Sequence, residues 1–131
     1  MPDLSRILKA DTPLTLAQVA RGAQPLVMAD LARASTGRAV FIAPDDSAMR
    51  AIVDAAAFFA PELEVIEFPA WDSLPYDRAS PALSISARRL SALFRLQAGK
   101  AKAQLVVTTA NAVLQRVLSP FRIRENVREF K

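Results

Sequence analysis

Hydrophobic residues along the chain fall into short runs that alternate with longer segments of helical periodicity. The short runs are bounded by turn residues and are typical of strands. They predict four strands, at residues 14–19, 39–43, 63–68 and 104–108. Apolar residues spaced three and four apart predict helices at about residues 3–11, 25–34, 47–60, 83–98 and 110–118.

The clearest helix of the set is the one at 47–60. Its apolar residues recur at helical spacing, and Arg50 and Asp54 fall on the opposite side. Asp45 and Asp46 stand directly before it, where a carboxylate can accept a hydrogen bond from a free backbone N–H of the first turn. We therefore expect one of them to cap this helix.

Strands that alternate with helices at this spacing indicate parallel strands joined by crossover helices. The expected fold is α/β, a three-layer sandwich with a small parallel sheet. We divide the chain into an N-terminal helical extension (1–13), an α/β lobe (14–120) and a charged segment (121–131) that begins a connection to a following domain. A loop without periodicity, 69–80, holds the only tryptophan and the only tyrosine of the chain.

Composition narrows the possible functions. Of 131 residues, 52% are hydrophobic, which excludes a disordered chain and allows a real core. The sequence has no cysteine and no histidine, which excludes disulfides, thiol nucleophiles and imidazole bases. Its apolar stretches are far shorter than the ~20 residues of a membrane span, so we expect no membrane contact and a cytoplasmic location.

The segment between the first predicted strand and its helix is where many α/β proteins bind phosphate. Here it reads Arg21, Gly22, Ala23, Gln24 and Pro25. A working P-loop needs a lysine for the β- and γ-phosphates and a Ser or Thr for magnesium, and both are missing. We therefore expect a degenerate loop that binds no nucleotide.

Two carboxylate pairs are candidates for metal binding or acid–base chemistry. Asp45 and Asp46 follow the end of a predicted strand, and Asp72 and Asp77 lie in the aromatic loop. Helix capping and turn hydrogen bonding explain the same positions. We favour these structural roles and predict no catalytic residue and no metal site.

Four basic residues suggest phosphate contacts. Arg88 and Arg95 lie two turns apart on one helix, and Lys100 and Lys102 follow its end. The net charge of +4 agrees with a DNA-binding surface. A solvated helix face with basic residues near its C-terminus explains the same pattern, so both interpretations stay open.

The aromatic loop carries a long motif. It reads FPAWDSLPYDRASP at 68–81 and is followed by SISARRLSAL at 84–93. This motif resembles the N-terminal region of the bacterial transcription-repair coupling factors. The flanks VFIAPD at 40–45 and NAVLQRV at 111–117 agree with it, and the resemblance covers residues 14–131.

The resemblance implies a helicase-like module related to the damage-verifying helicase subunit of the excision nuclease, with a degenerate P-loop. It implies a non-catalytic scaffold lobe that helps to recruit excision repair to stalled RNA polymerase, with no cofactor of its own. ATP and magnesium would act in the translocase domains of the full-length protein. The implied partners are the other domains of that protein, the A-subunit of the excision nuclease, RNA polymerase and DNA, mostly through surfaces outside this chain.

The resemblance also gives Trp71, Tyr76 and Asp77 a structural or domain-docking role within the motif loop. A small DNA-binding α/β domain that uses Arg88, Arg95, Lys100 and Lys102 is the alternative function.

Overall fold

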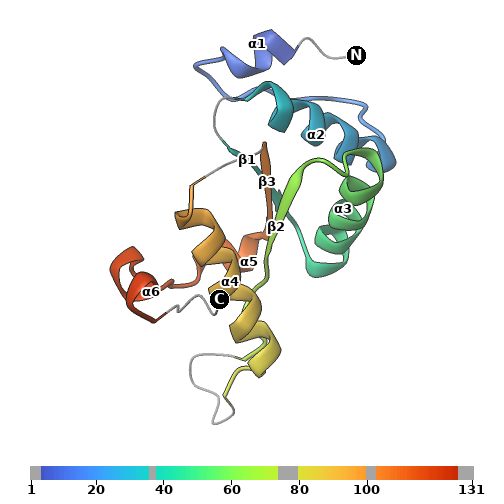
Figure 1. The fold of residues 1–131 in the computed structure, drawn as a ribbon. Coiled ribbons are helices and arrows are strands. Elements are labelled where there is room, and N and C mark those ends of the chain that lie inside the picture. The colour runs from blue at the N-terminus through green and yellow to red at the C-terminus, as the bar shows by residue number, and fades with distance from the viewer. Residues whose placement is uncertain (1–3, 36–37, 74–79, 100–102, 127–131) are drawn as a thin grey trace.

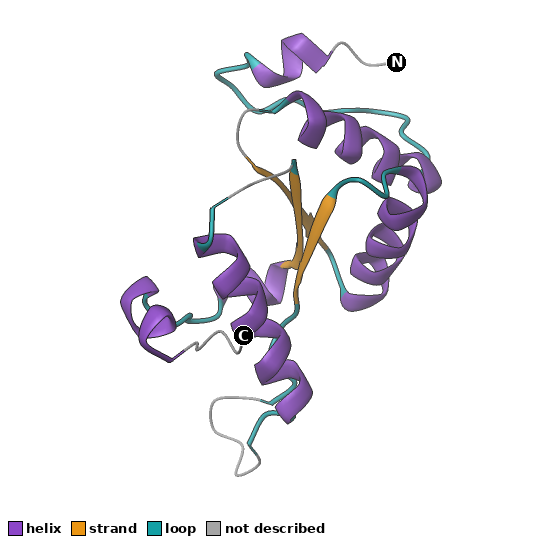
Figure 2. Cartoon of the chain, in the orientation of Figure 1, coloured by secondary structure: helices purple, strands orange, loops and turns teal. Residues whose placement is uncertain are grey.

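Three short strands lie between two groups of helices (Figures 1 and 2). The computed structural model describes residues 4–35, 38–73, 80–99 and 103–126. Its elements, in chain order, are α1 (Leu4–Leu8), the 3-10 turn η1 (Arg21–Ala23), α2 (Gln24–Ala34), β1 (Arg38–Ala43), α3 (Asp46–Phe59), β2 (Glu64–Phe68), α4 (Leu83–Gln97), β3 (Gln104–Thr109), α5 (Ala110–Leu114) and α6 (Pro120–Asn126).

The sheet is parallel and runs in the order β1-β3-β2. Its central strand β3 is buried at all six positions, which explains its apolar run at 105–107. Its polar residues Gln104, Thr108 and Thr109 are buried as well. Helices α2 and α3 cover one face, and α4 and α5 cover the other (Figure 1). The expected α/β fold with a small parallel sheet is confirmed, whereas its relation to P-loop domains stays a prediction.

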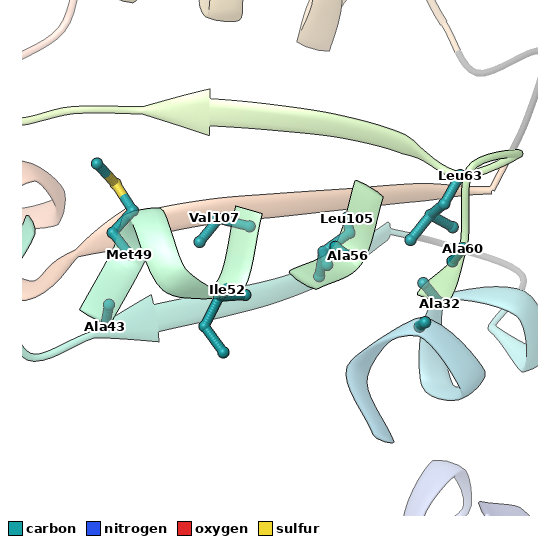
Figure 3. Packing of buried hydrophobic residues seen from close by; sticks show 10 residues of the cluster. Ala32, Ala43, Met49, Ile52, Ala56, Ala60, Leu63, Leu105 and Val107 are labelled. Carbon is teal, nitrogen blue, oxygen red and sulfur yellow. The ribbon is translucent and has the colours of Figure 1, made fainter. Parts of the chain in front are cut away.

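Alternate residues of β3 pack into the two halves of the core, one on each face of the sheet. Leu105 and Val107 pack with α3, and Val106 packs with α4, as the two-residue period of a strand requires. Figure 3 shows the larger half, in which small residues allow α3 to approach the sheet closely. Its fully buried members include Ala32, Ala43, Ala56 and Ala60.

Helix ends form largely where the sequence places them. The carboxylate of Asp45 accepts a hydrogen bond from the Ala48 N–H at 2.8 Å and caps α3, as expected. Thr109 caps α5 in the same way through the Ala112 N–H, at 3.3 Å. After α4, Gly99 has a φ of +79°, a conformation that favours glycine.

The strand predicted at 14–19 is wrong. This segment has no regular secondary structure, and Leu14 and Leu16 are exposed. Gln18 has a φ of 60°, which breaks an extended chain. The alternation of apolar residues is real but has no sheet partner, so the sheet has three strands within the described residues rather than four.

The helix predicted at 110–118 is shorter than expected, and the charged segment at 121–131 contains part of a further helix. Helix α5 ends at Leu114 because Gln115 turns to extended backbone. Helix α6 then begins at Pro120, and its Ile123 is 1% exposed. The proposed division into residues 1–13, 14–120 and 121–131 stays a prediction.

Candidate functional site

The loop that carries the family motif leaves β2 and packs against α4 through one arginine. The central carbon of the Arg89 guanidinium lies 4.3 Å from the centre of the Phe68 ring and 4.4 Å from that of the Trp71 ring. Arg89 is only 2% exposed. A guanidinium stacked on aromatic rings at this distance gains a favourable cation–π interaction, so Arg89 fixes both aromatic residues relative to the helix.

Hydrogen bonds tie three segments of the chain together at the same point. Arg89 Nη1 donates to the Pro69 carbonyl at 2.6 Å and to Gln115 Oε1 at 3.2 Å. Gln115 Oε1 also accepts from the Trp71 backbone N–H at 2.9 Å. We call Trp71, Arg89 and Gln115 the loop anchor, because they join the motif loop, α4 and the end of α5.

Among the described residues, no acid pairs with the charge of Arg89. Its hydrogen bonds within the described residues go to a carbonyl and an amide oxygen, and its buried Nη2 atom has no hydrogen-bond partner there. Burial lowers the pKa of Arg89 from its ordinary value. An arginine stays protonated at neutral pH all the same, so the anchor holds a buried positive charge.

The other end of the motif loop is closed by Asp72. Its carboxylate accepts from the Ala82 N–H at 3.1 and 3.3 Å, directly before α4 begins. Asp72 therefore has the structural role that we favoured. Tyr76 and Asp77 lie outside the described residues, so their expected role stays a prediction.

The predicted phosphate loop forms a single 3-10 turn. The turn Arg21–Ala23 is closed by a hydrogen bond from the Ala23 N–H to the Ala20 carbonyl, at 2.9 Å. Helix α2 then begins with Gln24 and Pro25. Gly22 has neither a positive φ nor any atom within 4 Å of an added Cβ, so this turn does not depend on glycine. Because the preceding strand is missing, the turn does not have the strand-to-helix setting of a P-loop.

A hollow of about 500 Å³ lies beside this turn at the end of β1, lined among others by Arg21, Gln24 and Asp45. The carboxylate of Asp45 is engaged in capping α3, and Asp46 lies exposed in its first turn. No group of three acidic side chains able to hold a metal ion occurs in the described residues.

The two described basic candidates are paired with acids of β2. Arg95 Nη2 lies 2.9 Å from Glu64 Oε1, and Arg88 Nη1 lies 3.6 Å from Glu67 Oε1. Hydrogen bonding from Gln104, followed by the bond from Arg95, lowers the pKa of Glu64. Lys100 and Lys102 lie outside the described residues. Phosphate contacts by these four residues stay a prediction. The alternative interpretation was a solvated helix face, and the structure adds that Arg88 and Arg95 form ion pairs with β2 on that face.

The anchor residues Arg89 and Gln115 are the ones that sequence reasoning missed. Arg89 looks like one of several surface arginines, yet it shares a helix face with Ile85, Ala92 and Leu96, at spacings of four, three and four. An arginine on the apolar face of an amphipathic helix is a signal of burial. Gln115 carries no comparable signal, because its position follows from where α5 ends.

Comparison with known proteins gives a consistent set of relatives. The transcription-repair-coupling factor of Haemophilus influenzae is 30% identical over 112 residues, or 86% of this chain and 10% of the relative. That of Escherichia coli is 29% identical over 110 residues, or 84% of this chain and 9% of the relative. That of Rickettsia bellii is 36% identical over 62 residues, or 47% of this chain and 5% of the relative.

The resemblance to the coupling factors is thereby confirmed over most of the chain, which spans about a tenth of the length of the first two relatives. No protein-family model matches the chain, and no solved structure matches it significantly. Within the described residues, no helix is both long and apolar enough to cross a bilayer.

Proposed function

From the chain's relationship to the transcription-repair coupling factors, we propose that it is a non-catalytic scaffold lobe of a module that recruits nucleotide excision repair to stalled RNA polymerase. The observation that carries this proposal is the loop anchor. Trp71, the central aromatic residue of the family motif, contacts Arg89 of its own chain and is held by Gln115. The motif is used to build a rigid surface and not to contact a reacting substrate.

The absence of phosphate-binding chemistry supports the same proposal. The segment at Arg21–Ala23 lacks the lysine and the hydroxyl residue of a P-loop, and it forms a short turn before α2. We infer that this chain binds no ATP and no magnesium, and that both act in other domains of the longer relatives. A cytoplasmic location fits this role.

Exposed apolar residues supply a surface for a neighbouring domain. Val40 and Ile42 of β1 are each 54% exposed on the edge strand of the sheet. Neighbouring apolar side chains on one face of an edge strand give another domain apolar surface to bury. We propose that this face of β1 contacts another part of the same module, and that the A-subunit of the excision nuclease, RNA polymerase and DNA are partners of the module as a whole.

A chimera tests the scaffold proposal. The 110 residues that match in the E. coli coupling factor are replaced by this chain, and both DNA-stimulated ATP hydrolysis and preferential repair of the transcribed strand are measured. We expect both activities to be retained. Loss of strand-preferential repair while ATP hydrolysis stays intact would overturn the proposal, because the replaced lobe would then supply more than a scaffold.

A further inference from the structure

Strand β2 forms one edge of the sheet, and its outer side has no strand neighbour within the described residues. The Glu64 N–H donates to the Ala103 carbonyl at 3.0 Å, so the backbone groups of Glu64 face β3. Because successive residues of a strand direct these groups to opposite sides, those of Val65 and Glu67 face outward. Such open donors and acceptors are able to pair with another extended chain.

The helices leave this edge accessible. A groove of about 460 Å³ lies along it and is lined by Val53 of α3, by Val65 and Glu67 of β2, and by residues of α4. Helices α3 and α4 pack on opposite faces of the sheet. The groove therefore lies between the two helix layers, at the outer side of β2 itself.

One side chain of α4 reaches across the groove to the backbone of β2. Arg95 Nη2 donates to the Val65 carbonyl at 3.2 Å, in agreement with an outward direction of this carbonyl. The same guanidinium is held by Glu64, whose Oε1 lies 3.0 Å from Nε and 2.9 Å from Nη2. Gln104 of β3 holds Glu64 in turn, because its Nε2 donates to Glu64 Oε2 at 2.6 Å. Arg95 is thus fixed at the edge, although its side chain is 39% exposed.

Arg88 lines the same groove but makes a different contact. Its Nη1 lies 3.6 Å from Oε1 of the Glu67 side chain, and its own side chain is 59% exposed. Within the described residues, it makes no hydrogen bond to the backbone of β2. Arg88 and Arg95 therefore differ in one respect that matters here, the occupation of a backbone acceptor.

We propose that Arg95 blocks the outer edge of β2 against the addition of a further strand, and that a second copy of this chain is the partner it excludes. Antiparallel pairing of β2 with itself is symmetric and places Val65 of each copy opposite Glu67 of the other. Each Arg95 has to leave its carbonyl first, and releasing a bond from a charged donor lowers an equilibrium constant roughly tenfold or more. A charged side chain at an edge is a known way for sheets to avoid such pairing. The block acts within this chain and does not depend on the scaffold role.

Sedimentation velocity over a range of concentrations measures the self-association of the 131-residue chain and of two matched variants. Arg95→Ala frees the Val65 carbonyl, whereas Arg88→Ala removes a charge from the same groove without freeing a backbone group. We expect Arg95→Ala to raise the association constant at least about tenfold and Arg88→Ala to leave it unchanged. An Arg95→Ala variant that associates no more strongly than Arg88→Ala would overturn the proposal.

A proline identifies the surface through which the variant associates. Glu67→Pro removes an outward backbone N–H, and proline is tolerated on an edge strand where this group faces solvent. The double variant Arg95→Ala/Glu67→Pro should return to the association of the unchanged chain. Association that persists in the double variant would place the contact on another surface and contradict the role of Arg95.

Circular dichroism shows whether each variant is folded. If Arg95→Ala does not fold, Arg95→Gln takes its place, because glutamine keeps part of the aliphatic stem on α4 and removes the charge. The same outcomes then support or overturn the proposal.

Discussion

Gln115 supplies the hydrogen-bond acceptor of the loop anchor. Its removal should destabilise the domain more than is usual for the replacement of a half-buried polar residue. In Gln115→Ala, Arg89 Nη1 loses its 3.2 Å bond, and the Trp71 backbone N–H loses its 2.9 Å bond. A hydrogen bond to a charged group contributes about 1.5–3 kcal/mol and a neutral one about 1 kcal/mol. Arg89 keeps its bond to the Pro69 carbonyl, which limits the loss. We therefore expect the free energy of unfolding to fall by about 2–3 kcal/mol.

Urea unfolding followed by Trp71 fluorescence measures this change. With a dependence on urea of ~1–3 kcal/mol per molar, typical of small domains, the midpoint should drop by about 0.7–3 M. The emission of the folded variant should also shift to longer wavelength, since Trp71 loses the bond that holds its backbone near Arg89.

Gln97→Ala is the matched control. Gln97 is also half-buried, but its Oε1 has no hydrogen-bond partner in the described part of the chain. Its replacement removes a buried oxygen that has no partner, so it should not lower the free energy of unfolding, and relief of the unsatisfied group is worth up to about 1–3 kcal/mol. A Gln115→Ala variant that is as stable as the unchanged chain would refute the view that the anchor holds the motif loop.

Other parts of the fold lead to three more predictions. Gly99→Ala should cost about 1 kcal/mol in thermal unfolding because of its positive φ, whereas Gly22→Ala should cost nothing, since no positive φ and no close contact requires glycine there. Folding lowers the pKa of Glu64 below its ordinary 4.5, so its stabilising effect is present above that pH and is lost as the pH falls through the lowered pKa. Glu64→Gln should therefore flatten the acid side of the stability profile, and an unchanged acid slope would contradict the assignment. Charge reversal of Arg88 and Arg95 should lower retention on duplex DNA no more than charge reversal of the exposed Arg6 and Arg50, because Arg88 and Arg95 are paired with acids of β2. A clearly larger loss would favour the DNA-binding alternative.

Features set by local chemistry could be predicted from the sequence. The apolar run at β3 and the cap of α3 at Asp45 both follow from the residues themselves, and both are confirmed. The strand predicted at 14–19 fails because alternation alone does not supply a sheet partner. Local pattern shows what a segment can form, and packing decides whether it does.

The residues that hold Trp71 were not predicted from the sequence. The motif placed Trp71 in a structural loop, but the residues that hold it come from α4 and from the end of α5. Arg89 could have been found from its place on the apolar helix face, whereas Gln115 depends on the point where α5 ends.

The central claim is that this lobe supports repair without binding or hydrolysing a nucleotide. Calorimetric titration of the chain with ATP and magnesium tests it most directly. The turn at Arg21–Ala23 offers neither the lysine nor the hydroxyl group that holds the phosphates and the metal ion. We predict no heat of binding above dilution and no hydrolysis. Saturable binding with a micromolar dissociation constant would contradict the account.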